Sequence, residues 1–364
     1  MDTLQANTTT IAKVLCIRSN KAWKWYRDFL SGFTDDLVQE EMHKNDVEVK
    51  DKGKIRTIRI PILETANFGK NMAIDEKKIG EDMHTVISNR DTGKIAVLAR
   101  TLKASDLELI IPKFNSKGFE VRTITRDLSN TYDWFSRMAF MNAGHIADKF
   151  HIIKNLLDAQ QDVRIRYRQE ALRKRRIKHD AFKKKEKQRE RSCKKEGKKF
   201  IKKKFSYRAK KFDNQETELE LLARSRYLLY KYESDWKDTQ KERAEILFKE
   251  YPQIKKAYKL SLKFRTWYRK DNVGSDISLI NKTLEQWYEQ VEKADIDEMS
   301  NFRSLVERHQ PYITAYFKEG HTNAIAECIN SKIQRFITIN QGTRDREFFY
   351  FRMKNYFSAP QKEI

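Results

Sequence analysis

Three acidic residues far apart in the chain stand where carboxylates could do chemistry. Asp75, in "NMAIDEKKIG" (71–80), follows a short apolar run typical of a strand interior, and Asp127 ends a second strand-like segment, "FEVRTITRD" (119–127). A carboxylate in apolar surroundings is costly unless a positive group pairs with it. Two of them on neighbouring strands repel each other unless a cation lies between them. Because hard divalent ions favour oxygen ligands, we predict a Mg²⁺ or Mn²⁺ site at the carboxyl edge of a sheet.

The third candidate is Glu327, in "EGHTNAIAECINSKIQRF" (319–336). A helix that starts near Thr322 gives this segment a polar stripe, which holds Glu327, and a separate apolar face that can pack on a sheet. The stripe comprises Asn323, Glu327, Asn330 and Gln334, and the apolar face comprises Ile325, Cys328, Ile329, Ile333 and Phe336. Asp75, Asp127 and Glu327 could together hold two ions. One would activate water or a 3′-hydroxyl, and the other would stabilise the leaving oxygen of a phosphodiester.

Each of these residues also has an ordinary structural explanation. An aspartate at a strand end is commonly a cap or a turn former, and a glutamate on a polar helix face is commonly solvated. The order strand Asp, later strand Asp, helix Glu favours the site. Side chains alternate along a strand, so Asp75 and Glu76 point to opposite faces and only one of them can belong to the site; Glu76 is then a supporting or surface residue.

The elements around the carboxylates predict an α/β fold. The pattern indicates three strands, a helix, a fourth strand, a helix and a short fifth strand, which is the order of a ribonuclease H-like core with a mixed five-stranded sheet and helices. These segments are 71–80, 83–89, 93–100, 104–114, 119–127, 131–143 and 145–153. We expect the first part of the core to span 71–158 and its final helices, with Glu327, to span 319–358. Residues 34–70 read as a linker and a lead-in strand.

Residues 8–30, within a first segment of 1–33, have the outline of a partial helix-turn-helix. They predict two short helices around a tight turn, with basic residues that could lie on DNA. A plain helical hairpin that packs on the main body is the other interpretation.

Residues 159–318 are predicted as a large, all-α insertion, because apolar residues recur there at helical spacing. The 364-residue chain carries a formal net charge of +23, and residues 164–211 alone hold 24 Lys and Arg against 5 Asp and Glu. Such a field attracts nucleic acid or an anionic surface more readily than a neutral metabolite. We therefore expect non-specific DNA contacts from this run, although a solvated charged hairpin would show the same composition. The expected contacts are Lys174, Arg175, Arg176, Lys183, Lys184 and Lys185.

The three cysteines are far apart and form no C-x-x-C pair, which argues against a zinc module or a disulfide framework and fits a reducing cytoplasm. No apolar stretch approaches the roughly 18 residues needed to span a bilayer, and no signal pattern is present. We expect a soluble, cytoplasmic, nucleoid-associated protein with no membrane partner.

Several blocks resemble the bacterial insertion-sequence transposases of ISL3 type, which have a DDE catalytic core. The resemblance runs from about Met72 to Met353 and rests on "AIDE", "TRDLSNTYDWF", "HIADKFHIIKNLLDA", "LLARSRYLLYKY", "YPQIKKAYKLSLKF" and "TNAIAECINSKIQRF". It implies a ribonuclease H-like core with a helical insertion before the last acidic residue. It also implies Mg²⁺-dependent cleavage at transposon ends, strand transfer into double-stranded target DNA, and a homo-oligomer assembled on DNA.

By this resemblance, Asp75, Asp127 and Glu327 match the catalytic and metal-binding triad. Asp148, Phe150 and His151 match the family's D-x-F-H block; His151 is a further site residue or a structural histidine at a strand-to-helix junction. Asn323 and Asn330 are expected to orient the metal site or contact phosphate, and Lys332, Arg335 and Arg344 to contact DNA.

The chain departs from the family at its front, where members usually carry a cysteine-bearing zinc region before a helix-turn-helix. A separately encoded N-terminal partner would supply end recognition, or the element has decayed. The alternative function is a catalytically inactive or truncated transposase-derived DNA-binding protein.

Overall fold

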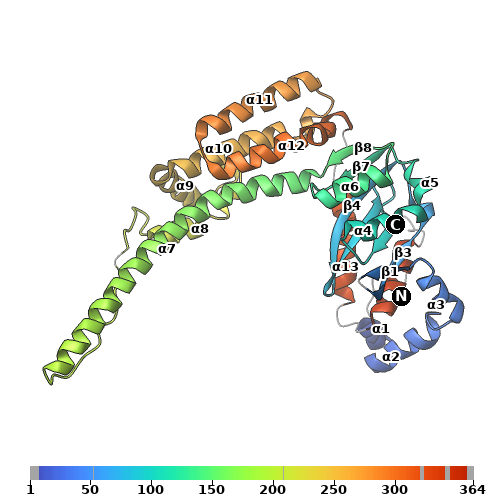
Figure 1. Ribbon diagram of the computed structural model, residues 1–364, viewed down its shortest axis with the longest axis horizontal. Helices are drawn as coiled ribbons and strands as arrows, with labels where there is room; N and C mark the ends of the chain where they lie inside the picture. Colours follow the sequence, from blue (N-terminus) through green and yellow to red (C-terminus); the bar gives the residue numbers. More distant parts are fainter. Residues whose placement is uncertain (1–7, 52, 208, 320–323, 341–344, 359–364) are drawn as a thin grey trace. The chain divides into compact units, whose positions relative to one another are not determined.

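The computed structural model describes residues 8–51, 53–207, 209–319, 324–340 and 345–358, in two compact units (Figure 1). Unit 1 comprises Met1–His151 and Pro311–Ile364, and unit 2 comprises Ile152–Gln310. Two helices, α7 (Lys149–Lys195) and α12 (Asp297–Glu319), contain the points where the chain passes from one unit to the other. The candidate carboxylates all belong to unit 1.

Unit 1 is built on a six-stranded mixed sheet with the order β3-β6-β5-β4-β7-β8. Strands β3 to β6 pair in antiparallel fashion, whereas β4, β7 and β8 are parallel. The strands are β3 (Ile62–Leu63), β4 (Asn71–Ile79), β5 (Asp82–Asn89), β6 (Ile95–Ala99), β7 (Thr123–Arg126) and β8 (Gly144–Ala147). The mixed α/β prediction is confirmed, but the sheet has six strands rather than five. The extra strand β3 is two residues long, too short to show a period-two pattern.

Both faces of the sheet are covered by helices, which explains why a central strand such as β6 is a continuous apolar run. All five residues of β6 are buried. Helices α4 (Ala104–Ile110) and α6 (Asn130–Ala139) bury residues such as Leu107 and Phe135 against one face. Helices α13 (Ala324–Ile339) and α14 (Arg346–Ser358) bury Ile333 and Met353 against the other. Cys328, predicted on the apolar face of α13, is instead exposed.

The N-terminal helices pack on unit 1 through aromatic side chains. Tyr26 and Phe33 contact Phe348 of α14 with ring centroids 5.7 and 5.1 Å apart. This is the packing expected of a helical hairpin that rests on the main body. The helical elements are α1 (Thr8–Val14), α2 (Ser19–Trp25), the π-helical turn Tyr26–Leu30 and α3 (Asp36–His43).

The segment predicted as a linker and a lead-in strand, residues 34–70, holds more regular structure than expected. It contains α3, the antiparallel pair β1 (Val47–Asp51) and β2 (Lys54–Ile58), and β3. The sequence of the β1–β2 pair shows no clear strand pattern, because the pair is largely exposed and has no strong apolar face.

Unit 2 is helical apart from one extended stretch that follows α7. Its core is rich in aromatic residues: Phe264 lies at the centre, with its ring centroid 5.0 Å from that of Trp287 and 5.2 Å from that of Phe302. The helices besides α7 and α12 are α8 (Glu218–Arg224), α9 (Asp238–Glu250), α10 (Pro252–Trp267) and α11 (Ile277–Ala294). Across the described part of the chain, no helix combines the length and the hydropathy needed to cross a bilayer.

A buried histidine–tyrosine pair joins the sheet to α14. His84 on β5 is fully buried; its Nδ1 lies 3.2 Å from the carbonyl oxygen of Asp82, and its Nε2 lies 2.7 Å from the hydroxyl of Tyr350. Nδ1 can therefore donate to the carbonyl while Nε2 accepts from the tyrosine, which is the pattern of a neutral imidazole. Burial lowers the pKa of His84 to about 4.

This pair predicts loss of stability in mild acid. The pKa of His84 in the folded protein lies below the ordinary value of 6.5, so the unfolded chain takes up a proton first as the pH falls. The contribution of neutral His84 to the free energy of unfolding should be fully present above pH 6.5. It should fall by up to about 3 kcal/mol as the pH is lowered toward 4. Urea unfolding at several pH values should show a shallower slope for His84→Gln. Part of the slope should persist, because burial also lowers the pKa of His145 to about 4. Equal slopes for the two proteins would contradict the prediction.

Candidate active site

Strand register brings three aspartates side by side, at the point where β7 and β8 end and β4 continues. Ala73 of β4 pairs with Thr125 of β7, and Arg126 of β7 pairs with Ala147 of β8, all in parallel. Continued along the strands, the same registers set Asp75 beside Asp127 and Asp127 beside Asp148. Carboxyl ends of parallel strands meet at one edge, where α/β proteins commonly place their sites.

Asp75 is held by neighbours on both oxygens yet reaches solvent. Its Oδ1 accepts a hydrogen bond from the backbone N–H of Glu76 at 2.8 Å, and its Oδ2 accepts one from the side-chain amide of Asn330 on α13. The side chain is 24% exposed, so it is not the deeply buried carboxylate that the apolar run suggested. Asn330 therefore links helix α13 to the strand that carries Asp75.

Asp127 directly follows β7 and turns the chain toward α6. Its Oδ1 accepts from the backbone N–H of Ser129 at 2.7 Å, and Ser129 in turn caps α6. The pKa of nearby Tyr132 of α6 is affected by the acidic residues around it. Burial raises the pKa of its hydroxyl, and the charges of Glu76, Asp127 and Asp75 raise it further. Asp75 and Asp127 thus act on one buried group.

Asp148 and His151 lie at the start of α7. Asp148 Oδ1 accepts from the backbone N–H of Phe150 at 2.8 Å, which is the geometry of a helix N-cap. The His151 Nε2 atom lies 3.9 Å from an oxygen of Asp75 and 3.9 Å from an oxygen of Asp148. His151 therefore lies between two of the aspartates, with both distances beyond hydrogen-bond range.

Two buried arginines bring positive charge close to the three aspartates, and neither was predicted from the sequence. Arg126 is 1% exposed, donates to the backbone carbonyl of Asp127 at 3.0 Å and pairs with Asp133. Arg90, in the turn after β5, donates to the Thr125 hydroxyl at 2.7 Å. Burial lowers the pKa of Arg90, and the charge of Asp148 opposes that effect. The signal available in the sequence was Arg126 directly before Asp127 in "TRDLS", where a charged residue closes an otherwise apolar strand.

Several predicted site residues fall outside the described parts. Glu327 belongs to helix α13, but its side chain lies outside what the structure describes, and Asn323 and Arg344 lie outside the described residues altogether. On the described part of α13, Lys332 is half-buried and Arg335 is exposed. The predicted DNA contacts Lys174, Arg175, Arg176, Lys183, Lys184 and Lys185 are all exposed along α7 in unit 2.

Comparison with known proteins gives a match to a protein family. A family model described as "Transposase", that of the DDE transposases of ISL3 type, matches residues 72–353. The chain belongs to this transposase family. No match is found among curated proteins or among solved structures. The matched range includes Asp75, Asp127 and the whole of α13.

The transposase offers donors that suit a divalent metal ion. Asp75 and Asp127 present the carboxylate oxygens that Mg²⁺ and Mn²⁺ prefer, and both side chains are partly exposed. Within the described residues, no group of three or more His, Cys, Asp or Glu side chains is arranged to hold a metal ion. The predicted third ligand, Glu327, is not among the side chains so searched.

Arg126 should matter more for the stability of the transposase than its neighbour Arg137. Both pair with Asp133 and lie over the ring of Tyr312, at 5.0 and 5.7 Å, but Arg137 is 56% exposed. We expect Arg126→Met to lower the free energy of unfolding by at least about 2 kcal/mol, because it removes the buried partner of a carboxylate. Arg137→Met should cost less than about 1 kcal/mol. Equal losses in urea unfolding would show that burial does not distinguish the two.

Proposed function

We propose that this transposase cuts DNA at transposon ends and joins the ends to double-stranded target DNA by metal-dependent phosphoryl transfer. The observation that carries the proposal is that the register of two adjacent parallel strands sets Asp75, in the middle of β4, beside Asp127, directly after β7, in a chain of this family. Phosphodiester chemistry at such a pair needs positioning and charge stabilisation rather than an elaborate protein nucleophile.

The topology supports a ribonuclease H-like core for this chemistry. The strands β6, β5 and β4 form an antiparallel meander, and β7 and β8 continue the sheet in parallel to β4. This is the order predicted from the sequence, with β3 added at the edge. Helix α13, which carries Glu327, follows the helical unit in the chain and packs on one face of the sheet.

In this proposal Asp75, Asp127 and Glu327 hold one or two Mg²⁺ or Mn²⁺ ions. The bound ions would supply Lewis-acid activation of water or a 3′-hydroxyl and stabilisation of the leaving oxygen. Asn330 orients the Asp75 carboxylate through its amide, and His151 adds a polar group between Asp75 and Asp148. Lys332 and Arg335, on the same helix as Asn330, are the residues of α13 that we expect to contact the DNA backbone.

Substitution of the three carboxylates should separate DNA binding from cleavage. Asp75→Asn, Asp127→Asn and Glu327→Gln each remove a metal-binding charge and should abolish Mg²⁺- or Mn²⁺-dependent nicking of end-sequence DNA. DNA binding should change less than about threefold, because most of the affinity comes from phosphate contacts elsewhere. Gel assays of nicking and strand transfer, alongside anisotropy binding, measure both properties.

Glu76→Gln is the matched control, since Glu76 is the exposed neighbour of Asp75 on the same strand. It should retain nicking. Full activity in any of the three carboxylate variants would remove that residue from the site. DNA binding by the unmodified protein with no cleavage at any metal concentration would favour the alternative, a transposase-derived DNA-binding protein.

A further inference from the structure

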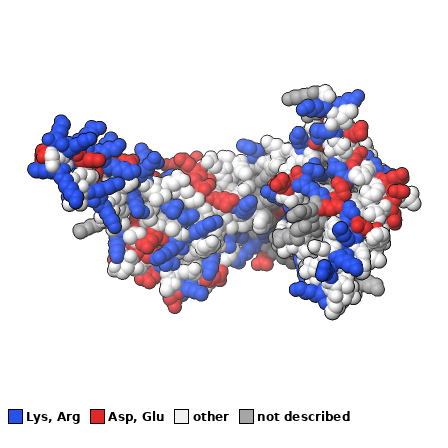
Figure 2. Space-filling view, turned by 90° about the horizontal axis from the view of Figure 1, so that it is seen from below, with Lys and Arg blue, Asp and Glu red and all other residues white. Residues whose placement is uncertain are grey.

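The most basic part of unit 2 is an ordered arm. We define the basic arm as residues 173–211, which hold 21 Lys and Arg against 4 Asp and Glu. It consists of the second half of α7 and an extended chain that returns beside it (Figure 1). The reversal follows Gly197, whose positive φ of 65° ends the helix as glycine commonly does. Lys and Arg gather visibly at the far end of α7 (Figure 2).

The returning chain packs on the helix through aromatic contacts. Phe205 lies with its ring centroid 4.8 Å from that of His179 and 5.5 Å from that of Phe182. Lys178 places its Nζ 5.3 Å from the ring centroid of Tyr207. Residue numbers fall along the return segment as they rise along the helix, so the two parts run antiparallel. The arm is therefore a helix with a chain fastened along it rather than a loose polybasic tail.

One acidic residue fastens the middle of the arm. Glu186 is 8% exposed; its Oε2 accepts the backbone N–H of Lys203 at 3.0 Å, and its other oxygen pairs with Arg189. The hydrogen bond from Lys203 is the main cause that lowers the pKa of Glu186. Arg189 also reaches back to the return segment, with its guanidinium 5.6 Å from the ring centroid of Phe200. Glu186 is thus a cross-link between the two parts of the arm.

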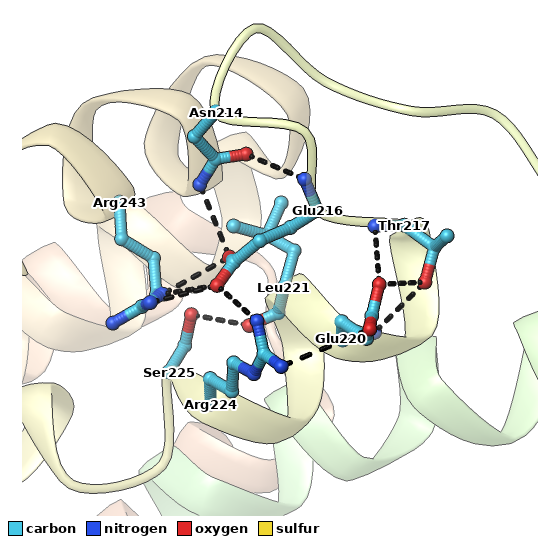
Figure 3. A network of polar contacts seen from close by, with 8 residues as sticks. All are labelled: Asn214, Glu216, Thr217, Glu220, Leu221, Arg224, Ser225 and Arg243. Atoms are coloured by element: carbon cyan, nitrogen blue, oxygen red, sulfur yellow. Dashed lines mark hydrogen bonds and ion pairs between the residues drawn. The ribbon is translucent and has the colours of Figure 1, made fainter.

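A second buried carboxylate fixes the root of the arm (Figure 3). Glu216 is 5% exposed and accepts hydrogen bonds from two arginines. Arg243 donates from Nη2 at 2.7 Å and from Nε, whose N–H is shared by both carboxylate oxygens at 3.0 and 3.1 Å, and Arg224 donates from Nη1 at 3.0 Å. Asn214 closes the adjoining turn by donating to the same carboxylate at 3.1 Å. Because Arg224 is on α8 and Arg243 is on α9, the return segment ends on a firm attachment to unit 2.

The cross-link at Glu186 brings two lysine triplets together. Lys183–Lys185 directly precede Glu186 on the helix. On the return segment, Lys202 and Lys204 flank Lys203, whose backbone N–H donates to Glu186. All six residues are exposed. Lys183, Lys184 and Lys185 pair with no carboxylate among the residues that the structure describes. Six positive charges are thereby concentrated on one short stretch of a preformed arm.

We propose that this arm is a preformed, sequence-independent binding surface for the phosphate backbone of duplex DNA, and that Glu186 is the residue that shapes it. The inference rests on the proposed function for its partner, since it takes DNA to be the substrate. The helical part of the arm, residues 173–195, is about 34 Å long at 1.5 Å per residue. That length matches roughly one turn of B-form DNA. Exposed lysines without a complementary set of hydrogen-bond acceptors suit phosphates rather than base edges.

The proposal makes a prediction that opposes simple charge counting. Glu186→Ala removes a negative charge from a DNA-binding arm, so a flexible polycation would bind DNA more tightly. A preformed arm would instead lose its cross-link, and the affinity for a random-sequence 30-base-pair duplex should fall about three- to tenfold at 0.1 M salt. The control is Glu190→Ala, one helical turn later, where the carboxylate is exposed and the charge change is identical. It should leave the affinity unchanged or slightly tighter.

A triple variant tests the lysines themselves in the same full-length protein. Lys183→Gln, Lys184→Gln and Lys185→Gln together should weaken duplex binding by more than tenfold and reduce the slope of log K against log salt by about 2 to 3. Limited trypsin digestion should show faster cleavage of the return segment in Glu186→Ala than in Glu190→Ala.

The outcomes separate the possibilities. Equal effects of the two glutamate variants on affinity and digestion would overturn the preformed arm, and unchanged binding by the triple variant would overturn its role in binding DNA. Tighter binding to single-stranded DNA or duplex RNA than to duplex DNA would overturn the choice of partner. Because these measurements concern binding alone, the arm can fail while metal-dependent nicking persists, and nicking can fail while the arm binds.

Discussion

The parallel pairing of β4, β7 and β8 is the constraint on which the site depends. It places three acidic side chains, Asp75, Asp127 and Asp148, at one sheet edge, where like charges oppose one another. The fold tolerates this because Arg126 and Arg90 are buried directly behind the edge and bring positive charge to it. Each aspartate also accepts a hydrogen bond from a backbone N–H, that of Glu76, Ser129 or Phe150, which fixes the position of one carboxylate oxygen.

The site and the core are coupled through helix α13. Ile329 and Ile333 on this helix are buried against the sheet, while the adjacent Asn330 bonds Asp75. The rotation of the helix about its axis is set by the packing of its apolar residues, and that same rotation decides which polar residues face the strand. A change in the core on this side of the sheet would therefore move groups at the site without touching them.

How much of this was predictable follows from the range of each interaction. The α/β order, the strand that carries Asp75 and the strand end beside Asp127 were predicted because they depend on local apolar patterns and on turns. The lead-in strand expected within 34–70 falls in the region of β2 and β3, but its division into two strands was not predicted, and β1 was missed because it is largely exposed. The sequence could not identify Arg126, Arg90 and Tyr312 as residues near the site, since their surroundings are formed by elements far apart in the sequence. The roles of Asp75, Asp127 and His151 stay predictions, as the structure gives their positions and not their chemistry.

In both units, buried charged side chains lie beside a cluster of exposed charges of the opposite sign. In unit 1, buried arginines allow aspartates to gather at an edge; in unit 2, the buried carboxylates of Glu186 and Glu216 allow lysines to gather along an arm. A buried charge is costly unless paired, so each of these groups holds its partners in one arrangement. The exposed charges beside it then keep a fixed spacing despite their mutual repulsion. For a polyanionic partner such as DNA, the spacing of these charges determines how many phosphates can be contacted at the same time. The few acidic residues of the arm affect binding because they set that spacing.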